Sequence, residues 1–168
     1  MLLYLVLFPL VLLLLLGTFF IVKQQTAAVI ERFGKFTSVR QSGLHIKIPV
    51  IDRVSGRVSL KVQQLDVVVE TKTKDDVFVK LKVSVQFKVI KDKVYDAFYK
   101  LDFPQEQMNA YVFDVVRAEV PKMILDDVFE KKDDIAIAVK GELNEAMKNY
   151  GFDIIKTLVT DIDPDAQV

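Results

Sequence analysis

The chain contains no cysteine and a single histidine, His45, among its 168 residues. The absence of cysteine excludes disulfides, thiolate metal sites and a cysteine nucleophile, and it leaves the redox compartment open. One histidine cannot form a two-histidine metal site, and a lone histidine beside apolar residues is more often structural than catalytic. The motifs G-x-S-x-G, H-E-x-x-H and the glycine-rich phosphate loop are also missing. We therefore expect no enzyme activity, no cofactor and no metal.

One acidic spacing, Asp161-x-Asp163-x-Asp165, resembles the first half of a calcium-binding loop. Pro164 lies inside this spacing, however, and Ala166 stands where such a loop requires glycine. The chain also ends before the glutamate that closes such loops could occur. We interpret these residues as the end of a strand followed by the N-cap of a helix.

Charge is balanced over the whole chain but absent from its beginning. The 23 basic and 23 acidic residues give a net charge of zero, and all of them lie at or after Lys23. A protein that binds nucleic acid as its main partner needs a concentrated basic face, so this composition argues against nucleic acid. The part after Lys23 is expected to be a soluble, highly charged domain.

The stretch Leu2–Val22 has no charged residue and contains ten leucines. Its 21 residues would form a helix of roughly 31 Å, close to the thickness of the bilayer hydrocarbon. The sequence therefore predicts a single transmembrane helix, which Pro9 could kink. Residues that represent this membrane anchor are Leu2, Leu5, Leu12, Leu16, Phe20 and Val22.

A cleaved secretory signal peptide is the alternative reading of this stretch. It is disfavoured because no basic residue precedes the apolar run, the run is long, and Thr18–Phe20 is bulky where small residues are expected. The cations that follow, from Lys23 to Arg40, place the domain on the cytoplasmic side by the positive-inside rule.

Strand patterns come next. Thr26–Phe33 is strand-like, and within Gly43–Ile51 apolar residues alternate with His45 and Lys47 until Pro49 ends the run. Because the anchor holds this region near the bilayer, its apolar side chains are candidates for contact with the membrane surface, and packing into the domain core is the alternative. The candidate residues of this membrane-surface loop are Leu44, Ile46, Ile48, Val50 and Ile51.

The clearest alternation covers Val77–Ile90, where seven apolar residues share one face. A sheet with one wet face is usually antiparallel, so we expect Arg57–Val69 and Val77–Ile90 to pair as a hairpin. Helical spacing then follows over Asp92–Lys100, from Pro104 to Pro121, and from Asp133 to Gly151. Phe152–Ile162 is strand-like again. This order predicts an α+β fold with helices on one side of an antiparallel sheet.

Several longer runs resemble one known family. They are Val62–Val67 (VQQLDV), Glu70–Asp75 (ETKTKD), Ala110–Lys122 (AYVFDVVRAEVPK), Leu125–Glu130 (LDDVFE) and the segments Tyr150–Phe152 and Asp161–Asp165. These runs resemble the SPFH, or Band 7, superfamily of stomatins, prohibitins and flotillins, and most closely its branch of hypersensitive-induced reaction proteins. Together they span most of residues 26–168.

The resemblance implies an SPFH domain, a curved antiparallel sheet with packed helices and two lobes. It also implies a non-enzymatic membrane scaffold that assembles into rings or cages and organises membrane microdomains. The expected partners are membrane lipid and further copies of the chain. The alternative is a regulatory subunit that binds a membrane protease or channel. Gly43–Ile51 resembles the family's apolar membrane-facing loop.

The expected organisation is an anchor over residues 1–23 and an SPFH domain over residues 24–168, with lobes of about 24–91 and 92–168. Plant members of this branch begin with a lipidation signal, whereas this chain begins with an apolar stretch. The resemblance implies a helical coiled coil after the SPFH domain, and the sequence stops at Val168, where that helix would begin. Either the sequence is a truncated piece or this member is short, and lateral contacts between SPFH domains are the other expected route to assembly.

Overall fold

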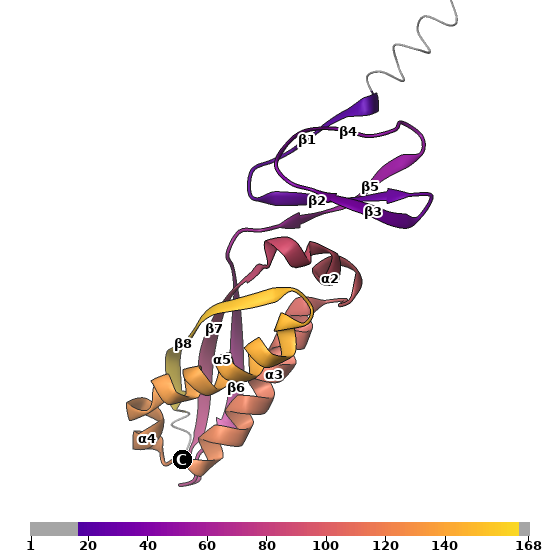
Figure 1. Ribbon diagram of the computed structural model, residues 1–168. Coiled ribbons are helices and arrows are strands. Elements are labelled where there is room, and N and C mark those ends of the chain that lie inside the picture. Colours follow the sequence, from indigo (N-terminus) through magenta and orange to yellow (C-terminus); the bar gives the residue numbers. More distant parts are fainter. Residues whose placement is uncertain (1–16, 165–168) are drawn as a thin grey trace, which may run out of the picture. The chain divides into compact units, whose positions relative to one another are not determined.

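The computed structural model describes residues 17–164, and its internal contacts divide the chain into two units (Figure 1). The division falls between Lys61 and Val62. The boundary that we expected near Lys91 is therefore wrong. The change from strand to helix at Lys91 lies inside the second unit, because strands on both sides of the helices join one sheet.

The N-terminal unit contains two small antiparallel sheets. Its strands are β1 (Phe19–Val22), β2 (Thr26–Arg32), β3 (Lys35–Arg40), β4 (Gly43–Ile46) and β5 (Asp52–Ser59). One sheet has the order β3-β2-β5, and the other pairs β1 with β4. The central strand β2 contributes the core, since Ala27–Ile30 are buried. The strand that we predicted over Thr26–Phe33 is confirmed by β2.

The end of the predicted transmembrane helix is wrong. Gly17 and Thr18 are helical, but Phe19–Val22 forms β1, which pairs with β4 from Phe19↔Ile46 to Val22↔Gly43. Both faces of β1 carry apolar side chains, so a scan for hydrophobicity cannot distinguish this strand from a continuing helix. Leu2–Leu16 lies outside the described residues. Within residues 17–164, no helix is long and apolar enough to cross a bilayer.

The C-terminal unit is built on a three-stranded antiparallel sheet of order β6-β7-β8. Its strands are β6 (Gln63–Lys72), β7 (Phe78–Val89) and β8 (Phe152–Pro164). The strand predicted over Val77–Ile90 is confirmed, and its inward residues from Val79 to Val89 are buried. The returning strand predicted over Phe152–Ile162 is also confirmed. The antiparallel α+β fold class holds.

Helices cover one face of this sheet, as predicted. They are the 3₁₀ turns η1 (Lys91–Lys93) and η2 (Val120–Lys122) and the α-helices α2 (Val94–Tyr99), α3 (Pro104–Glu119), α4 (Leu125–Glu130) and α5 (Lys132–Lys148). Helix α5 contacts β8, α3 contacts β6, and the two helices contact each other (Figure 1). Pro104 starts α3 and Pro121 ends it, because proline suits the first turn and breaks the interior.

The predicted hairpin of Arg57–Val69 with Val77–Ile90 is wrong in part. Residues up to Ser59 belong to β5 and pair with β2, and only the residues from Gln63 onward pair with β7. The alternation of Val58, Leu60 and Val62 runs through the junction, so the sequence pattern carries no sign that the chain changes sheets there.

Gly151 makes the turn from α5 into β8. Its φ is +84°, and a Cβ at this position would lie 2.5 Å from the carbonyl oxygen of Lys93. Both the left-handed backbone and the close approach require glycine. The turn brings β8 back beside β7, where Ile90 N–H donates to the Gly151 carbonyl at 2.8 Å.

Candidate membrane-facing surface

The β1–β4 ribbon has one apolar face that nothing in the described chain covers. Phe19 lies opposite Ile46, and Ile21 lies opposite Leu44, with all four side chains exposed. Side chains of directly opposite strand residues lie on the same face, so these four form one contiguous apolar surface. On the other face the Phe20 ring lies 5.6 Å from the His45 ring, and Val22 is buried.

The loop of residues 47–51 extends this apolar surface. Ile48 is exposed, and Val50 is 92% exposed. Val50 also has a φ of 70°, a left-handed conformation that β-branched residues rarely adopt. A strained conformation persists only where its surroundings impose it. For Val50, the contacts that hold the loop in this conformation are those of Asp52.

Asp52 closes the loop with four hydrogen bonds. One carboxylate oxygen lies 2.8 Å from Arg32 Nε. The other accepts from the Ile48 N–H at 2.9 Å and from Arg32 Nη2 at 3.3 Å. The Asp52 N–H in turn donates to the Ile48 carbonyl at 2.8 Å. The hydrogen bond from Arg32, followed by the one from Ile48, holds the pKa of the Asp52 carboxyl below its usual value. The carboxylate is therefore charged at neutral pH and fixes the start and end of the loop.

The loop lies next to the residues where the described chain begins. The Lys47 N–H donates to the Thr18 carbonyl at 2.8 Å. A Cβ added at Gly17 would lie 3.5 Å from the Pro49 Cβ, so the loop passes close to Gly17 as well. The end of the apolar stretch, at Gly17 and Thr18, therefore lies beside the exposed apolar loop.

The candidate residues from the sequence separate into three groups. Leu44, Ile46, Ile48 and Val50 are exposed and lie on the same small ribbon and loop, whereas Ile51 is half-buried. Of the anchor residues, Phe20 packs on His45 and Val22 is 2% exposed, so Val22 belongs to the protein core and cannot face lipid. Leu2, Leu5, Leu12 and Leu16 lie outside the described residues.

Phe19 and Ile21 complete the apolar face, although they are not among the residues that we predicted for the membrane surface. Along β1, exposed Phe19 and Ile21 alternate with the less exposed Phe20 and Val22, and this two-residue period of exposure is typical of a strand. Every residue in this part of the chain is apolar, so the alternation is invisible to a scan for hydrophobicity.

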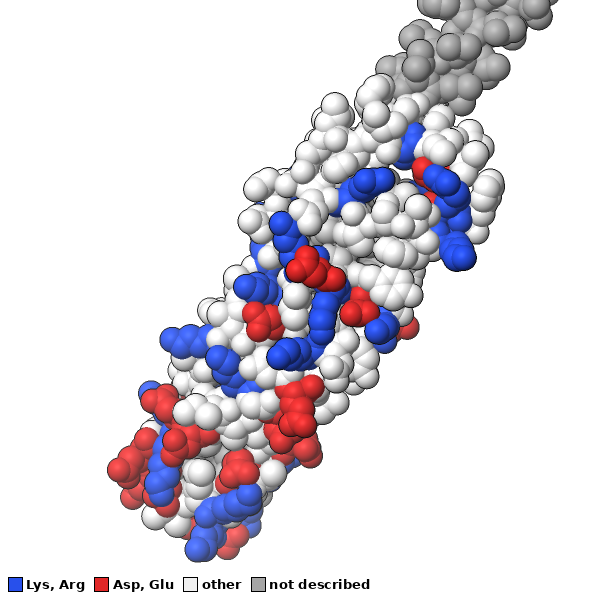
Figure 2. All heavy atoms as spheres, viewed as in Figure 1, with Lys and Arg blue, Asp and Glu red and all other residues white. Residues whose placement is uncertain are grey.

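The neutral chain divides into two units of opposite charge. The N-terminal unit has eight basic and two acidic residues, whereas the C-terminal unit has fifteen basic and twenty-one acidic residues. In Figure 2, basic side chains predominate on the visible face of the N-terminal unit, and acidic side chains gather near α4 on the other unit. The apolar surface thus belongs to a unit with a net charge of +6.

A polar cluster on the sheet of the C-terminal unit is structural. The Ser84 hydroxyl donates to Asp66 at 2.7 Å, and Lys82 Nζ lies 3.2 Å from the other carboxylate oxygen. Hydrogen bonds from Ser84, Gln64 and Lys82 hold the pKa of Asp66 below its usual value, which makes the carboxylate a weak base. Ser84 is buried, so its hydroxyl is not presented to a substrate.

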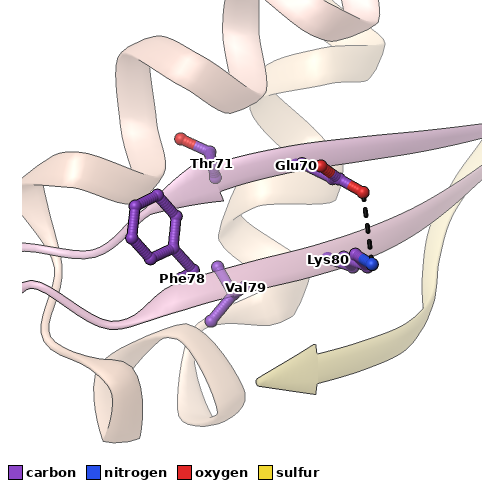
Figure 3. A pocket seen from close by; sticks show the side chains of 5 residues that line it. All are labelled: Glu70, Thr71, Phe78, Val79 and Lys80. Carbon is purple, nitrogen blue, oxygen red and sulfur yellow. Dashed lines mark ion pairs between the residues drawn. The ribbon is translucent and has the colours of Figure 1, made fainter. Parts of the chain in front are cut away.

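A shallow hollow at the end of the β6–β7 hairpin also has no feature of a functional site. It is lined by Glu70, Thr71, Phe78, Val79 and Lys80 (Figure 3). Lys80 lies 3.3 Å from Glu70, so the two charges satisfy each other. Over residues 17–164, no group of three His, Asp or Glu side chains is placed to hold a metal ion. Asp161 and Asp163 lie in β8, as the strand end that we predicted.

Comparison with known proteins shows that the chain is similar to members of one family. A model of the SPFH domain / Band 7 family matches residues 20–168. Hypersensitive-induced response protein 4 of Arabidopsis thaliana is 45% identical over 148 residues, which cover 88% of this chain and 51% of the relative. Mitochondrial stomatin-like protein 2 of Homo sapiens is 28% identical over 142 residues, which cover 84% of this chain and 39% of the relative.

The chain thus spans about half the length of the plant relative and less of the human one. Neither relative carries the name of an enzyme.

Proposed function

The chain belongs to the SPFH domain / Band 7 family, and from this premise we propose that it is a membrane-anchored scaffold with no catalytic activity of its own. Proteins of this family associate with membranes and self-assemble. In this proposal the N-terminal apolar stretch holds the chain in a bilayer, the loop and ribbon touch its surface, and copies of the chain assemble laterally. Such an assembly organises the membrane around it.

The observation that carries the proposal is the exposed apolar surface of the N-terminal unit. Its members are Phe19, Ile21, Leu44, Ile46, Ile48 and Val50. Soluble proteins rarely expose a contiguous apolar patch of this kind unless a partner or a membrane covers it. The hydrogen bond from the Lys47 N–H to the Thr18 carbonyl favours a membrane, because it joins the loop to the end of an uncharged stretch that has the composition of an anchor.

The anchor that we propose is shorter than the sequence pattern suggested. With β1 starting at Phe19, the apolar run is Leu2–Thr18, seventeen residues without a charge. As a helix it would be about 26 Å long, at the short end of what spans a bilayer. Exposed Phe19 and Ile21 would then lie where the chain leaves the hydrocarbon, where apolar side chains can enter the boundary between headgroups and acyl chains.

Extraction of membranes tests the anchor. We expect the full chain to remain in the membrane pellet after washing with alkaline carbonate. A Leu12→Arg, Leu13→Arg variant should move to the supernatant, because each arginine at the centre of a helix opposes insertion by about 2.5–3.5 kcal/mol. Ile137→Arg is the matched control, since Ile137 is exposed on α5 and should not affect the pellet.

Sizing in detergent tests the assembly. We expect particles far larger than the 19.2 kDa chain, and ring or cage shapes in electron micrographs. Release of the unmodified chain by carbonate would contradict the anchor. A monomer in every mild detergent would contradict the scaffold, and turnover of a substrate would contradict the absence of catalysis.

A further inference from the structure

The turn between β2 and β3 displays an aromatic side chain in an unfavourable conformation. Phe33 and Gly34 are the two residues of this turn, with φ values of 50° and 79°, and Phe33 is 84% exposed. Two-residue hairpin turns with positive φ at both positions strongly prefer Asn-Gly. Phenylalanine at the first position both strains the backbone and exposes a large apolar ring. Neither feature helps the hairpin fold.

The strand register places this turn at the same end of the sheet as the apolar loop. Arg32, the last residue of β2, pairs with Asp52, the first residue of β5. Phe33 therefore follows β2 where the loop of residues 47–51 leads into β5. The ion pair of Arg32 with Asp52 joins the two segments directly at this end.

Basic side chains predominate at this end of the sheet. Arg32 and Lys35 flank the turn, Lys47 is the first residue of the loop, and Arg53 follows Asp52 in β5. The acids nearby are Glu31 and Asp52, and Asp52 is buried and paired with Arg32. Apolar tips surrounded by cations match the interface of a bilayer with anionic headgroups, where rings enter the acyl boundary and cations meet phosphate.

We propose that the Phe33 turn is a second membrane-contacting element, which together with the loop of residues 47–51 docks the N-terminal unit on anionic lipid. This inference rests on the proposed function, because the anchor brings this end to the bilayer through the hydrogen bond from the Lys47 N–H to the Thr18 carbonyl. The unit's net charge of +6 selects the lipid class. Phe33 is the depth-setting residue of the turn, and Lys35 is its headgroup-binding residue.

The absence of tryptophan from the chain makes the test direct. The full chain with Phe33→Trp is placed in nanodiscs of phosphatidylcholine, with or without phosphatidylglycerol, whose acyl chains are either normal or brominated. Bromine quenches only an indole that reaches the acyl region. Val50→Trp reports on the loop, and Ile137→Trp on α5 is the exposed control.

We expect brominated acyl chains to quench the indole of the Phe33→Trp and Val50→Trp variants and to leave the indole of Ile137→Trp bright. Quenching at position 33 should be stronger with phosphatidylglycerol and should weaken as salt is added. Lys35→Glu should reduce the equilibrium for contact by roughly fivefold or more, since one cation near an anionic surface contributes about that factor. Lys61→Glu, the same charge change beyond the opposite end of β5, should have little effect.

The outcomes separate the inference from the proposed function. Quenching at position 50 without quenching at position 33 overturns the second element. Equal quenching in the two lipids overturns the anionic preference. A blue-shifted emission at position 33 that bromine does not quench indicates burial against protein and also overturns the inference. Release of the chain by carbonate, in contrast, overturns the proposed function itself.

A second variant removes dependence on the reporter. Phe33→Asn provides the residue that the turn prefers, so the hairpin should remain folded while its apolar tip is lost. In the Val50→Trp background, Phe33→Asn should decrease quenching by anionic brominated lipid. Unchanged quenching at position 50 would show that the loop docks without help from the turn, against the inference.

Discussion

The guanidinium of Arg32 lies 2.8 Å from the carboxylate of Asp52, at paired positions of β2 and β5. Arg32 directly precedes the Phe33 turn, and Asp52 closes the loop that carries Val50. One ion pair therefore holds two exposed apolar tips on the same side of the N-terminal unit. The same carboxylate accepts the Ile48 N–H, so its charge serves both segments.

Replacing Asp52 should loosen the loop and leave the C-terminal unit unchanged. In Asp52→Asn a single neutral side-chain oxygen replaces the two charged oxygens that accept from Arg32 Nε, Arg32 Nη2 and the Ile48 N–H, so these bonds become fewer and weaker. We expect faster amide hydrogen exchange at Ile48, measured on the full chain in detergent. Asp102→Asn, in an exposed turn, is the control. Unchanged exchange at Ile48 would show that the loop does not depend on this carboxylate.

Acid should destabilise the fold. The pKa values of Asp52, Asp66 and Asp75 are lowered by hydrogen bonds, with the largest contributions from Arg32, Ser84 and Thr73 respectively. A lowered folded-state pKa gives stability that is complete above the usual value of 3.8 and is lost as pH falls through the folded-state pKa. The urea midpoint should be level above about pH 5 and should fall below the usual aspartate pKa. Asp66→Asn should lessen this fall, and an unaltered profile would argue against the assignment.

Phe33→Asn should stabilise the hairpin. A left-handed conformation is costly for most side chains and easier for asparagine, so we expect a gain of a few tenths to about 1 kcal/mol in the free energy of unfolding. Phe33→Ala shares the left-handed penalty and should show little gain. Urea unfolding of the three chains in detergent measures the difference. A loss of stability in Phe33→Asn would mean that the ring has folded-state contacts of its own.

Two phenylalanines on β7 should respond very differently to truncation. Phe87 is buried against the Phe152 ring at 6.2 Å, and Phe87→Ala should cost about 3–5 kcal/mol through the cavity that it leaves. Phe78 is 61% exposed, with the Lys72 ammonium 5.5 Å from its ring, and Phe78→Ala should cost about 1 kcal/mol or less. Equal losses measured by denaturant unfolding would contradict the placement of the core.

Two glycines provide a similar contrast. Gly151→Ala should destabilise by more than about 1 kcal/mol, because φ is positive and the new Cβ would meet the Lys93 carbonyl. Gly141→Ala should stabilise by about 0.5–1 kcal/mol, since Gly141 is exposed within α5 and a Cβ there meets nothing within 4 Å. Thermal unfolding of the two variants should move the midpoint in opposite directions.

The sequence predicted secondary structure best where one face of an element is exposed to solvent and the other is buried. The alternation along β7 and the proline at each end of α3 predicted those elements closely, because burial on one side imposes a visible period. β1 was missed for the opposite reason. One of its faces is core and the other is exposed apolar surface, so no polar residue reveals the period of a strand.

The division into units and the Phe33 turn were missed because their causes are not local. Val58, Leu60 and Val62 keep one alternation while the chain passes from one sheet to another, and only the pairing partners reveal the change. Phe33 is exceptional only once its positive φ and its register beside Asp52 are known. Phe33-Gly34 in the sequence suggests at most a turn.

The middle position of β7 has a consequence for how the chain is made. Its first partner, β6, comes just before it in the chain and is joined to it by a short turn. Its second partner, β8, begins at Phe152, opposite Val89, and is synthesised only after α2 to α5. The C-terminal unit therefore cannot complete its sheet until β8 has left the ribosome. The N-terminal unit has all its strands by Ser59, so translation itself sets the order in which the two halves mature.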